Sequence, residues 1–233
     1  MTTAQSKKNK ADSTIFGLRP EGEKIVRHQI SNGGTSISVL SWGATIQELR
    51  VMGESHSLLL GGRDVAAYLG SMQYFGAVVG PVANRIAGAE MEIGGIRHQL
   101  DQNEAGRTTL HSGVAGYSGR NWRFTNVTPT RCRLELHHPD GLGGIPGNID
   151  ASVTYTIDTA GHLEIEMTGA ADQPTYFNPA FHGYWNLSGS ADLSDHRLMV
   201  PATSYLAVDD AQLPLGAPVS VAGSEFDYRH ARA

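Results

Sequence analysis

The sequence is poor in cysteine, with Cys132 alone among 233 residues. An intrachain disulfide is therefore impossible, and the chain fits a reducing compartment. Cys132 lies in a strand-like run of residues. There, a half-buried structural thiol is a better interpretation than a nucleophile.

The chain also lacks long apolar runs and an excess of basic residues. No stretch is long or apolar enough to span a bilayer, and the polar start resembles neither a signal peptide nor an anchor. The net charge is −5, which gives no electrostatic reason to expect nucleic acid or an anionic membrane as a partner. We therefore expect a cytoplasmic protein with a flexible tail over residues 1–14, and its oligomeric state stays open.

No amphipathic stretch reaches the length of an ordinary helix, whereas 28 glycines and 10 prolines favour many short strands. Period-2 alternation predicts strands at residues 24–30, 35–40, 45–51, 120–124, 132–137, 149–158 and 162–168. Residues 90–100 read as a hairpin that turns at Gly94 and Gly95. Residues 158–161 are a second turn, and residues 64–70 a single helical turn. The pattern indicates an all-β fold, an antiparallel β-sandwich or barrel, in one domain over residues 15–233.

Spacings typical of metal sites are missing from the sequence. There is no HxH, HExxH or CxxC pattern. His137 and His138 are adjacent, so in a strand they point to opposite faces and cannot chelate one ion. We expect no metal and no cofactor.

Side chains that suit a neutral polyol gather in three segments that contain glycine. These are residues 80–88 with Asn84 and Arg85, residues 108–113 with His111, and residues 177–187 with Asn178 and His182. Guanidinium, amide, aromatic and imidazole groups bind hydroxyls and move their protons. Taken singly, each has a structural explanation, since an arginine in a loop is commonly a surface donor and an aromatic-rich strand is commonly core.

Seven short matches in series carry a resemblance to a known family. They are Gly43 to Ile46, Gly80 to Ile86, Leu110 to Gly113, Trp122, His138 to Asn148, Asn178 to Leu187 and Tyr205 to Arg229. In this order and near spacing, the chain resembles the aldose 1-epimerase, or galactose mutarotase, family from about residue 15 to 229. The resemblance implies a large antiparallel β-sandwich, the galactose mutarotase-like supersandwich. It also implies interconversion of the α and β anomers of aldohexoses such as galactose or glucose, without a cofactor.

The resemblance also implies roles for the candidate residues. Asn84 and Arg85 would hold sugar hydroxyls, with Asn178 as a further substrate-binding candidate. His111 would hydrogen-bond near the ring oxygen, and His182 would be the general acid that protonates it. Imidazole suits these proton transfers because its ordinary pKa lies near neutrality. The flanking amides of Asn178 and Asn186 are candidates to orient His182.

The sequence departs from the family pattern in two places. Phe181 and Trp185 replace the family's usual residues around His182, which predicts a tighter or more apolar pocket. The family's substrate-binding Asp and catalytic Glu lie downstream of residues 226–229, where only four residues follow here. Neither can be assigned, and we expect a C-terminally shortened sandwich. The alternatives to an active epimerase are a catalytically impaired sugar-binding or regulatory sandwich and a truncated, non-functional fragment.

Overall fold

The first layer of the protein is a four-stranded antiparallel sheet. The structure, a computed structural model, describes residues 13–232. The strands, in the order β1-β2-β3-β4, are β1 (Ser13–Leu18), β2 (Lys24–Asn32), β3 (Thr35–Leu40) and β4 (Ile46–Val51). The tail expected at residues 1–14 lies outside the described residues, except that Ser13 and Thr14 open β1.

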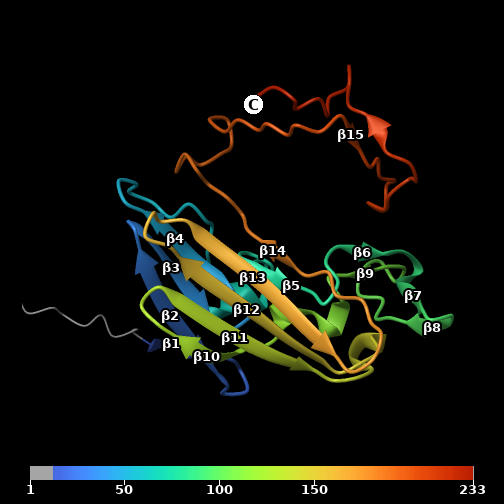
Figure 1. Ribbon diagram of the computed structural model, residues 1–233, viewed down its shortest axis with the longest axis horizontal. Helices are drawn as coiled ribbons and strands as arrows, with labels where there is room; N and C mark the ends of the chain where they lie inside the picture. The colour runs from blue at the N-terminus through green and yellow to red at the C-terminus, as the bar shows by residue number, and fades with distance from the viewer. Residues whose placement is uncertain (1–12, 233) are drawn as a thin grey trace, which may run out of the picture.

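The second layer is another four-stranded antiparallel sheet, which packs on the first (Figure 1). Its strands, in the order β10-β11-β12-β13, are β10 (Arg123–Val127), β11 (Arg131–His138), β12 (Ile149–Ile157) and β13 (Leu163–Ala171). Buried residues such as Val39, Leu134 and Tyr155 fill the space between the sheets. The predicted all-β sandwich is confirmed.

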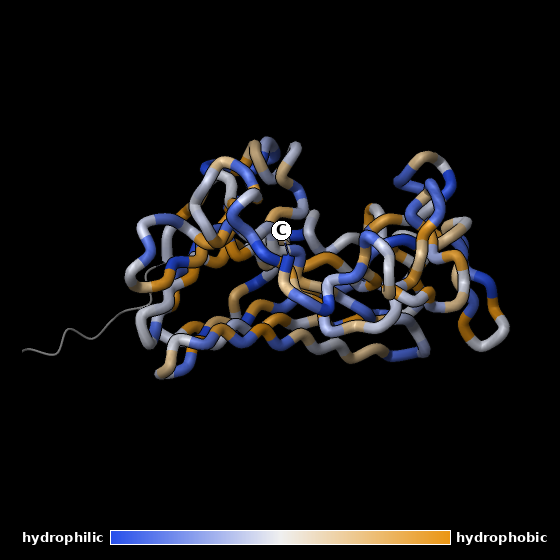
Figure 2. The backbone as a smooth tube through the Cα atoms, turned by 90° about the horizontal axis from the view of Figure 1, so that it is seen from above, coloured by the Kyte–Doolittle hydropathy of each residue, from blue (hydrophilic) through white to orange (hydrophobic). Residues whose placement is uncertain are grey.

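The alternation along β11 explains which side chains form the core, and similar alternation follows the long strands in Figure 2. Cys132 and Leu134 are fully buried, whereas His137 points outward and pairs with Asp150 at 2.8 Å. His138 is buried on the opposite face, as predicted for adjacent strand residues. Burial raises the pKa of the Cys132 thiol to about 12, so this cysteine is structural.

The predicted turns and the single helical turn are present. Gly94 and Gly95, with φ of +59° and +81°, join β7 (Glu90–Ile93) to β8 (Ile96–Gln99), and residues 158–162 close the β12–β13 hairpin. Helix α1 (Val65–Leu69) starts where the Asp64 carboxylate accepts the Ala67 N–H at 2.9 Å. No helix within residues 13–232 is long and apolar enough to cross a membrane.

One predicted strand starts late. The strand expected at residues 120–124 begins only at Arg123. The chain turns first, because Trp122 is buried and donates its indole N–H to the Tyr117 carbonyl at 3.1 Å. Residues 13–232 contain four short 3₁₀ turns, which are η1 (Ala87–Ala89), η2 (Gly113–Ala115), η3 (Tyr117–Gly119) and η4 (Leu142–Gly144).

Two small strand pairs beside the sandwich contain Arg85 and His182 and lead directly into His111. β5 (Ala77–Val79) pairs with β14 (Ala180–His182), and β6 (Arg85–Ile86) pairs with β9 (Thr109–Leu110). After β14 the chain continues as the C-terminal arm, residues 187–232, which is drawn in orange to red in Figure 1. The arm contains only the short strands β15 (Ser204–Tyr205) and β16 (Val219–Ser220).

Gly76 links β4 to β14, and its replacement by alanine should destabilise the protein. Its carbonyl accepts the Ile46 N–H at 2.8 Å, and its N–H donates to the His182 carbonyl at 2.9 Å. With φ of +68°, an added Cβ would lie 2.2 Å from the Ile46 oxygen. We expect Gly76→Ala to cost more than the ~1–2 kcal/mol of a left-handed residue alone, measured by urea unfolding.

Gly88 provides the matched control for this prediction. It has φ of +65° but open space around its Cα. Gly88→Ala therefore measures backbone strain without a clash. Equal losses of stability in the two variants would show that the contact with Ile46 contributes nothing.

Candidate active site

The structure brings His111 and His182 together, although they come from different parts of the chain. His182 ends β14, and His111 directly follows β9. Their ring centroids lie 5.2 Å apart, with the ring planes at 85°. Two imidazoles at this distance can reach one small ligand from two directions.

Asn84 holds His111 in a defined orientation through its backbone. The Asn84 N–H donates to His111 Nδ1 at 2.9 Å, and the His111 N–H donates to the Asn84 carbonyl at 3.0 Å. Because Nδ1 accepts a hydrogen bond, the neutral ring carries its proton on Nε2. Both residues have a positive φ, +63° for Asn84 and +51° for His111, a backbone conformation that is uncommon outside glycine and is enriched at functional sites.

His111 is neutral at physiological pH. Burial, assisted by the charges of His182 and Arg85, lowers its pKa to about 4, while the charge of Glu104 acts in the opposite direction. The residue as a whole is 9% exposed. The ring therefore offers an uncharged N–H donor rather than an imidazolium, which suits a neutral hydroxyl or ether oxygen.

This low pKa predicts a loss of stability in mild acid. The folded-state pKa of His111, about 4, lies below its ordinary value of 6.5. As the pH falls from 6.5 toward 4, the unfolded chain takes up the proton first, so the free energy of unfolding falls. We expect His111 to contribute a loss on the order of 3 kcal/mol by pH 4.

Urea unfolding at pH 7, 5 and 4 measures this contribution. His111→Gln, which can still accept the Asn84 N–H, should show a smaller drop than the unchanged protein. His138 is also buried with a pKa lowered to about 4, and it is present in both proteins. A drop of equal size in the variant would contradict the assignment.

Glu104 fixes Arg85 beside the histidine pair. Arg85 Nε and Nη2 donate to the two carboxylate oxygens of Glu104, each at 2.7 Å. Thr108 donates its hydroxyl to the same carboxylate at 2.9 Å, and Arg85 Nη1 contacts Asn84 Oδ1 at 3.4 Å. The pairing lowers the pKa of Glu104 and raises that of Arg85. The two bonds to Glu104 therefore fix the orientation of the guanidinium plane, with Nη1 facing the side-chain amide of Asn84.

Two tyrosine rings stack with the imidazole of His182. Tyr74 stacks at 5.8 Å between centroids and 27°, and Tyr184 at 5.2 Å and 23°. Phe75 stacks on Tyr184 at 3.7 Å, and Tyr74 also meets the His111 ring edge to face at 4.8 Å. Burial, followed by the nearby Glu104 charge, raises the pKa of Tyr74. The rings, rather than amides, orient His182.

The two asparagines near His182 have other structural tasks. Asn186 uses both ends of its amide within its own loop, bonding Ser190 at 3.0 Å and the Gly189 N–H at 3.0 Å, so the suggestion that it orients His182 is wrong. Asn178 holds the loop at residues 81–83 through its backbone, at 2.7 Å and 2.9 Å. Its side chain is exposed, and its substrate-binding role stays a prediction.

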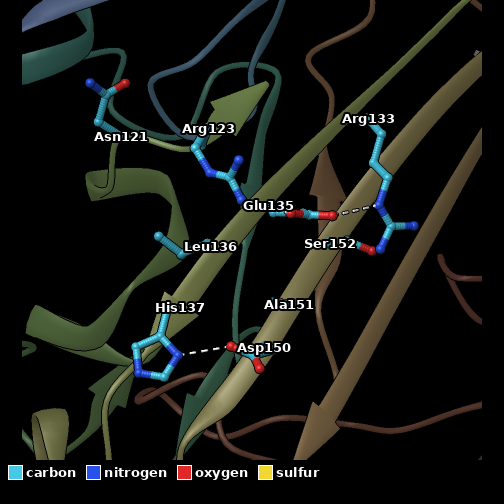
Figure 3. A pocket seen from close by; sticks show the side chains of 9 residues that line it. All are labelled: Asn121, Arg123, Arg133, Glu135, Leu136, His137, Asp150, Ala151 and Ser152. Carbon is cyan, nitrogen blue, oxygen red and sulfur yellow. Dashed lines mark hydrogen bonds and ion pairs between the residues drawn. The ribbon is translucent and has the colours of Figure 1, made fainter. Parts of the chain in front are cut away.

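A hollow of about 580 Å³ on the outer face of the second sheet is separate from this site (Figure 3). Its charged side chains already pair with each other. Arg133 bonds Glu135 at 3.0 Å, and His137 bonds Asp150 at 2.8 Å. Neither His111 nor His182 lines it, so it is no part of the histidine site.

Sequence reasoning missed Glu104 and Tyr74. Glu104 lies in a polar turn, and its sequence surroundings are those of an ordinary surface loop. Tyr74 lies next to Phe75, and its surroundings are those of an ordinary core aromatic residue. Only the fold places both beside His111, whose pKa responds to the charge of Glu104. A spacing rule along the chain could not have found them.

The site at one side of the open β-sandwich suits a neutral polyhydroxyl ligand. It combines an uncharged imidazole donor, a guanidinium of fixed orientation and stacked aromatic rings. The fold and these side chains define the class of the protein as an antiparallel β-sandwich with a polar, aromatic-lined site at its side. The family model described as aldose 1-epimerase matches residues 27–233. The chain belongs to the aldose 1-epimerase family.

Curated relatives and solved structures agree with this assignment. Galactose mutarotase of Mus musculus is 37% identical over 222 residues, which cover 93% of this chain and 64% of that protein. Maltose epimerase of Levilactobacillus brevis is 34% identical, covering 85% of this chain and 60% of that protein. The crystal structure of galactose 1-epimerase from Lactobacillus acidophilus matches with a TM-score of 0.84 and 29% identity, over 96% of this chain and 66% of that one. The chain thus spans just under two thirds of the length of these relatives.

Proposed function

We propose that this protein interconverts the α and β anomers of an aldohexose by opening and reclosing the sugar ring. The observation that carries the proposal is the perpendicular pair of His111 and His182, 5.2 Å apart, with His111 held as a neutral Nε2–H donor. A hemiacetal opens when its C1 hydroxyl loses a proton while the ring oxygen gains one. Two imidazoles around one small ligand supply groups for the ring-oxygen side of this reaction.

Each residue has a stated step in the proposed mechanism. His182 gives a proton to the ring oxygen as the bond from C1 to that oxygen breaks, and the C1 hydroxyl loses its own proton to a base. His111 donates a hydrogen bond near the ring oxygen. Arg85, Asn84 and Asn178 hold the remaining hydroxyls. Water accepts the proton of the C1 hydroxyl, because no residue of the site is assigned as its base. Rotation about the C1–C2 bond and the reverse proton transfers, from water to the C1 oxygen and from the ring hydroxyl to His182, give the other anomer, so the reaction needs no cofactor.

A second candidate function is sugar binding with little turnover. The observation that favours it is the state of Glu104, the carboxylate beside His111. Two 2.7 Å hydrogen bonds tie it to Arg85, and its pKa is lowered. A carboxylate in that state is a weak base for the C1 hydroxyl. Under this alternative the protein holds an aldose and leaves the anomers to exchange slowly in water.

The substrate is a small neutral aldose, with galactose and glucose as the first sugars to test. The names of the relatives differ in the sugar, since one is a galactose mutarotase and another a maltose epimerase. A buried, structural Cys132 accords with a reducing compartment such as the cytoplasm.

One sample can test binding and turnover together. NMR spectra of the histidine rings, recorded while D-galactose or D-glucose is added, report contact at His111 and His182. Polarimetry on the same sample follows α-D-glucose to anomeric equilibrium. Shifts at both rings with accelerated equilibration support the epimerase, and shifts without acceleration support the binding protein. Rings that do not respond to either sugar would contradict both.

A further inference from the structure

The outer face of the second sheet carries its charges in separate rows. Along β11, Arg131 and Arg133 alternate with buried residues and therefore lie on the outer face. Along β13, Glu164 and Glu166 alternate with residues that pack against the core, so they lie on the same outer face. One side of this face is therefore basic and the other side is acidic.

The register of the sheet aligns the two rows. Arg131 is opposite Thr156 of β12, and Thr156 is opposite Glu164. Arg133 and Glu166 are aligned in the same way, two residues further along the strands. Two strand spacings, roughly 10 Å, separate each arginine from its glutamate. Arg131 and both glutamates accordingly form no ion pair within residues 13–232.

The charges of the two sides balance. On the basic side, Glu135 pairs with Arg123 at 3.1 Å and with Arg133 at 3.0 Å, as Figure 3 shows for Arg133. Three arginines and one glutamate on β10 and β11 leave an excess of two positive charges. The two glutamates of β13 supply two negative charges. The face is therefore complementary to a copy of itself that is turned round.

Short side chains separate the two charged rows. Between the rows, β12 presents Ser152, Thr154 and Thr156 on the outer face. Ser152 and Thr154 are buried there, because the longer side chains of the neighbouring strands cover them. Ser152 also bonds the Thr168 hydroxyl at 2.7 Å. The charged rows therefore stand higher than β12 and can contact a second flat surface.

We propose that two copies of this chain associate through these faces, outer sheet on outer sheet, about a two-fold axis parallel to β12. In this arrangement Arg131 faces the partner's Glu164, and Arg133 faces the partner's Glu166. Each contact occurs twice, as a two-fold symmetric interface requires. A two-fold axis that runs across the strands would instead place arginines over arginines.

The same charges disfavour the other way in which two sheets join. β13 is an edge strand of its sheet, and two copies of β13 pairing edge to edge would place their glutamates side by side on one face. Like charges opposite each other destabilise a strand pair, and charged side chains commonly protect a free edge in this way. Association through the face avoids this repulsion.

The size of the face sets the strength of the dimer. Its three longest strands have eight or nine residues. With strands ~4.8 Å apart and ~3.4 Å per residue, the face measures roughly 500 Å² per copy. The total of about 1,000 Å² lies just below the range of stable specific interfaces. We therefore expect a weak dimer that forms at high protein concentration.

Sedimentation velocity of the full chain over a wide range of concentrations tests the proposal. Arg131→Glu places two repulsive contacts in the dimer and should weaken it by about tenfold. Glu164→Arg should weaken it by a similar factor. The double variant Arg131→Glu with Glu164→Arg should restore the dimer, because each pair is attractive again with its signs exchanged. Both residues are exposed and unpaired within residues 13–232, so no ion pair within the chain is lost.

Arg63→Glu is the matched control, since Arg63 is an exposed arginine just before α1, and it should leave the dimer unchanged. Glu164→Arg lowers the net charge of −5, so an effect of net charge alone would strengthen association in that variant. A chain that is monomeric at every concentration would overturn the proposal. Association that survives both single reversals, or that the double variant fails to restore, would overturn it as well. None of these readouts involves sugar, so the proposed function is tested separately.

Discussion

Replacing His182 with alanine is expected to lower the rate of anomer interconversion by about 10²–10⁴, the usual contribution of a positioned general acid. The His182 imidazole stacks with the rings of Tyr74 and Tyr184, at 5.8 Å and 5.2 Å between centroids, and these contacts restrict its orientation. Sugar affinity should change less than the rate, because Arg85 and Asn84 remain. Polarimetry with α-D-glucose or α-D-galactose measures the rate, and calorimetry measures the affinity.

Two further variants make this result specific. His162→Ala removes an exposed imidazole that pairs with Asp158 at 2.9 Å in the β12–β13 turn, and its rate should match the unchanged protein. His111→Ala should weaken both affinity and rate, because in the proposed mechanism His111 donates a hydrogen bond throughout the reaction. An unchanged rate in His182→Ala, with the fold intact by circular dichroism, would remove His182 from the mechanism.

Much of the sandwich could be predicted because its strands alternate in a way that only a half-buried sheet explains. Residues 132–137 predicted β11 to within one residue at each end. The late start of β10 could not be predicted. Trp122 turns into the core, a choice that depends on the position of the Tyr117 carbonyl and so on tertiary packing. A sequence pattern indicates the periodicity of buried residues, but it does not indicate which buried hydrogen-bond donor pairs with which acceptor.

The candidate site divides in the same way. His111, His182, Asn84 and Arg85 were identified from local composition and family resemblance, and the fold brings them together. The sequence assigned Asn84 a side-chain role, yet its backbone N–H is what fixes the His111 ring, at 2.9 Å. This backbone contact depends on the positive φ of Asn84. Asparagine adopts positive φ more often than most residues, but its presence in a sequence does not show that it does so.

No sequence pattern indicated that Glu104 is the partner of Arg85. Two roles for Glu104, orienting Arg85 or acting as a base, predict different effects of its replacement. If Glu104 orients Arg85, then Glu104→Gln should weaken sugar affinity by about tenfold, the loss of roughly one charge-assisted hydrogen bond. The rate at saturating sugar should then change by no more than about twofold. If Glu104 were the base for the C1 hydroxyl, that rate should instead fall by about 10²–10⁴. Polarimetry over a range of sugar concentrations distinguishes the two outcomes.

A structural readout independent of turnover completes this test. The Arg85 Nε–H donates to Glu104 at 2.7 Å, so its NMR resonance should move in Glu104→Gln and partly recover in Glu104→Asp. Glu135→Gln is the matched control, because it breaks a similar pair with Arg133 on the outer face of the second sheet and should leave both the resonance and the affinity unchanged. An Arg85 resonance that stays in place, together with a large loss of rate at saturation, would assign Glu104 as the base. The low pKa of that carboxylate and its two bonds to Arg85 make the orienting role the expected result.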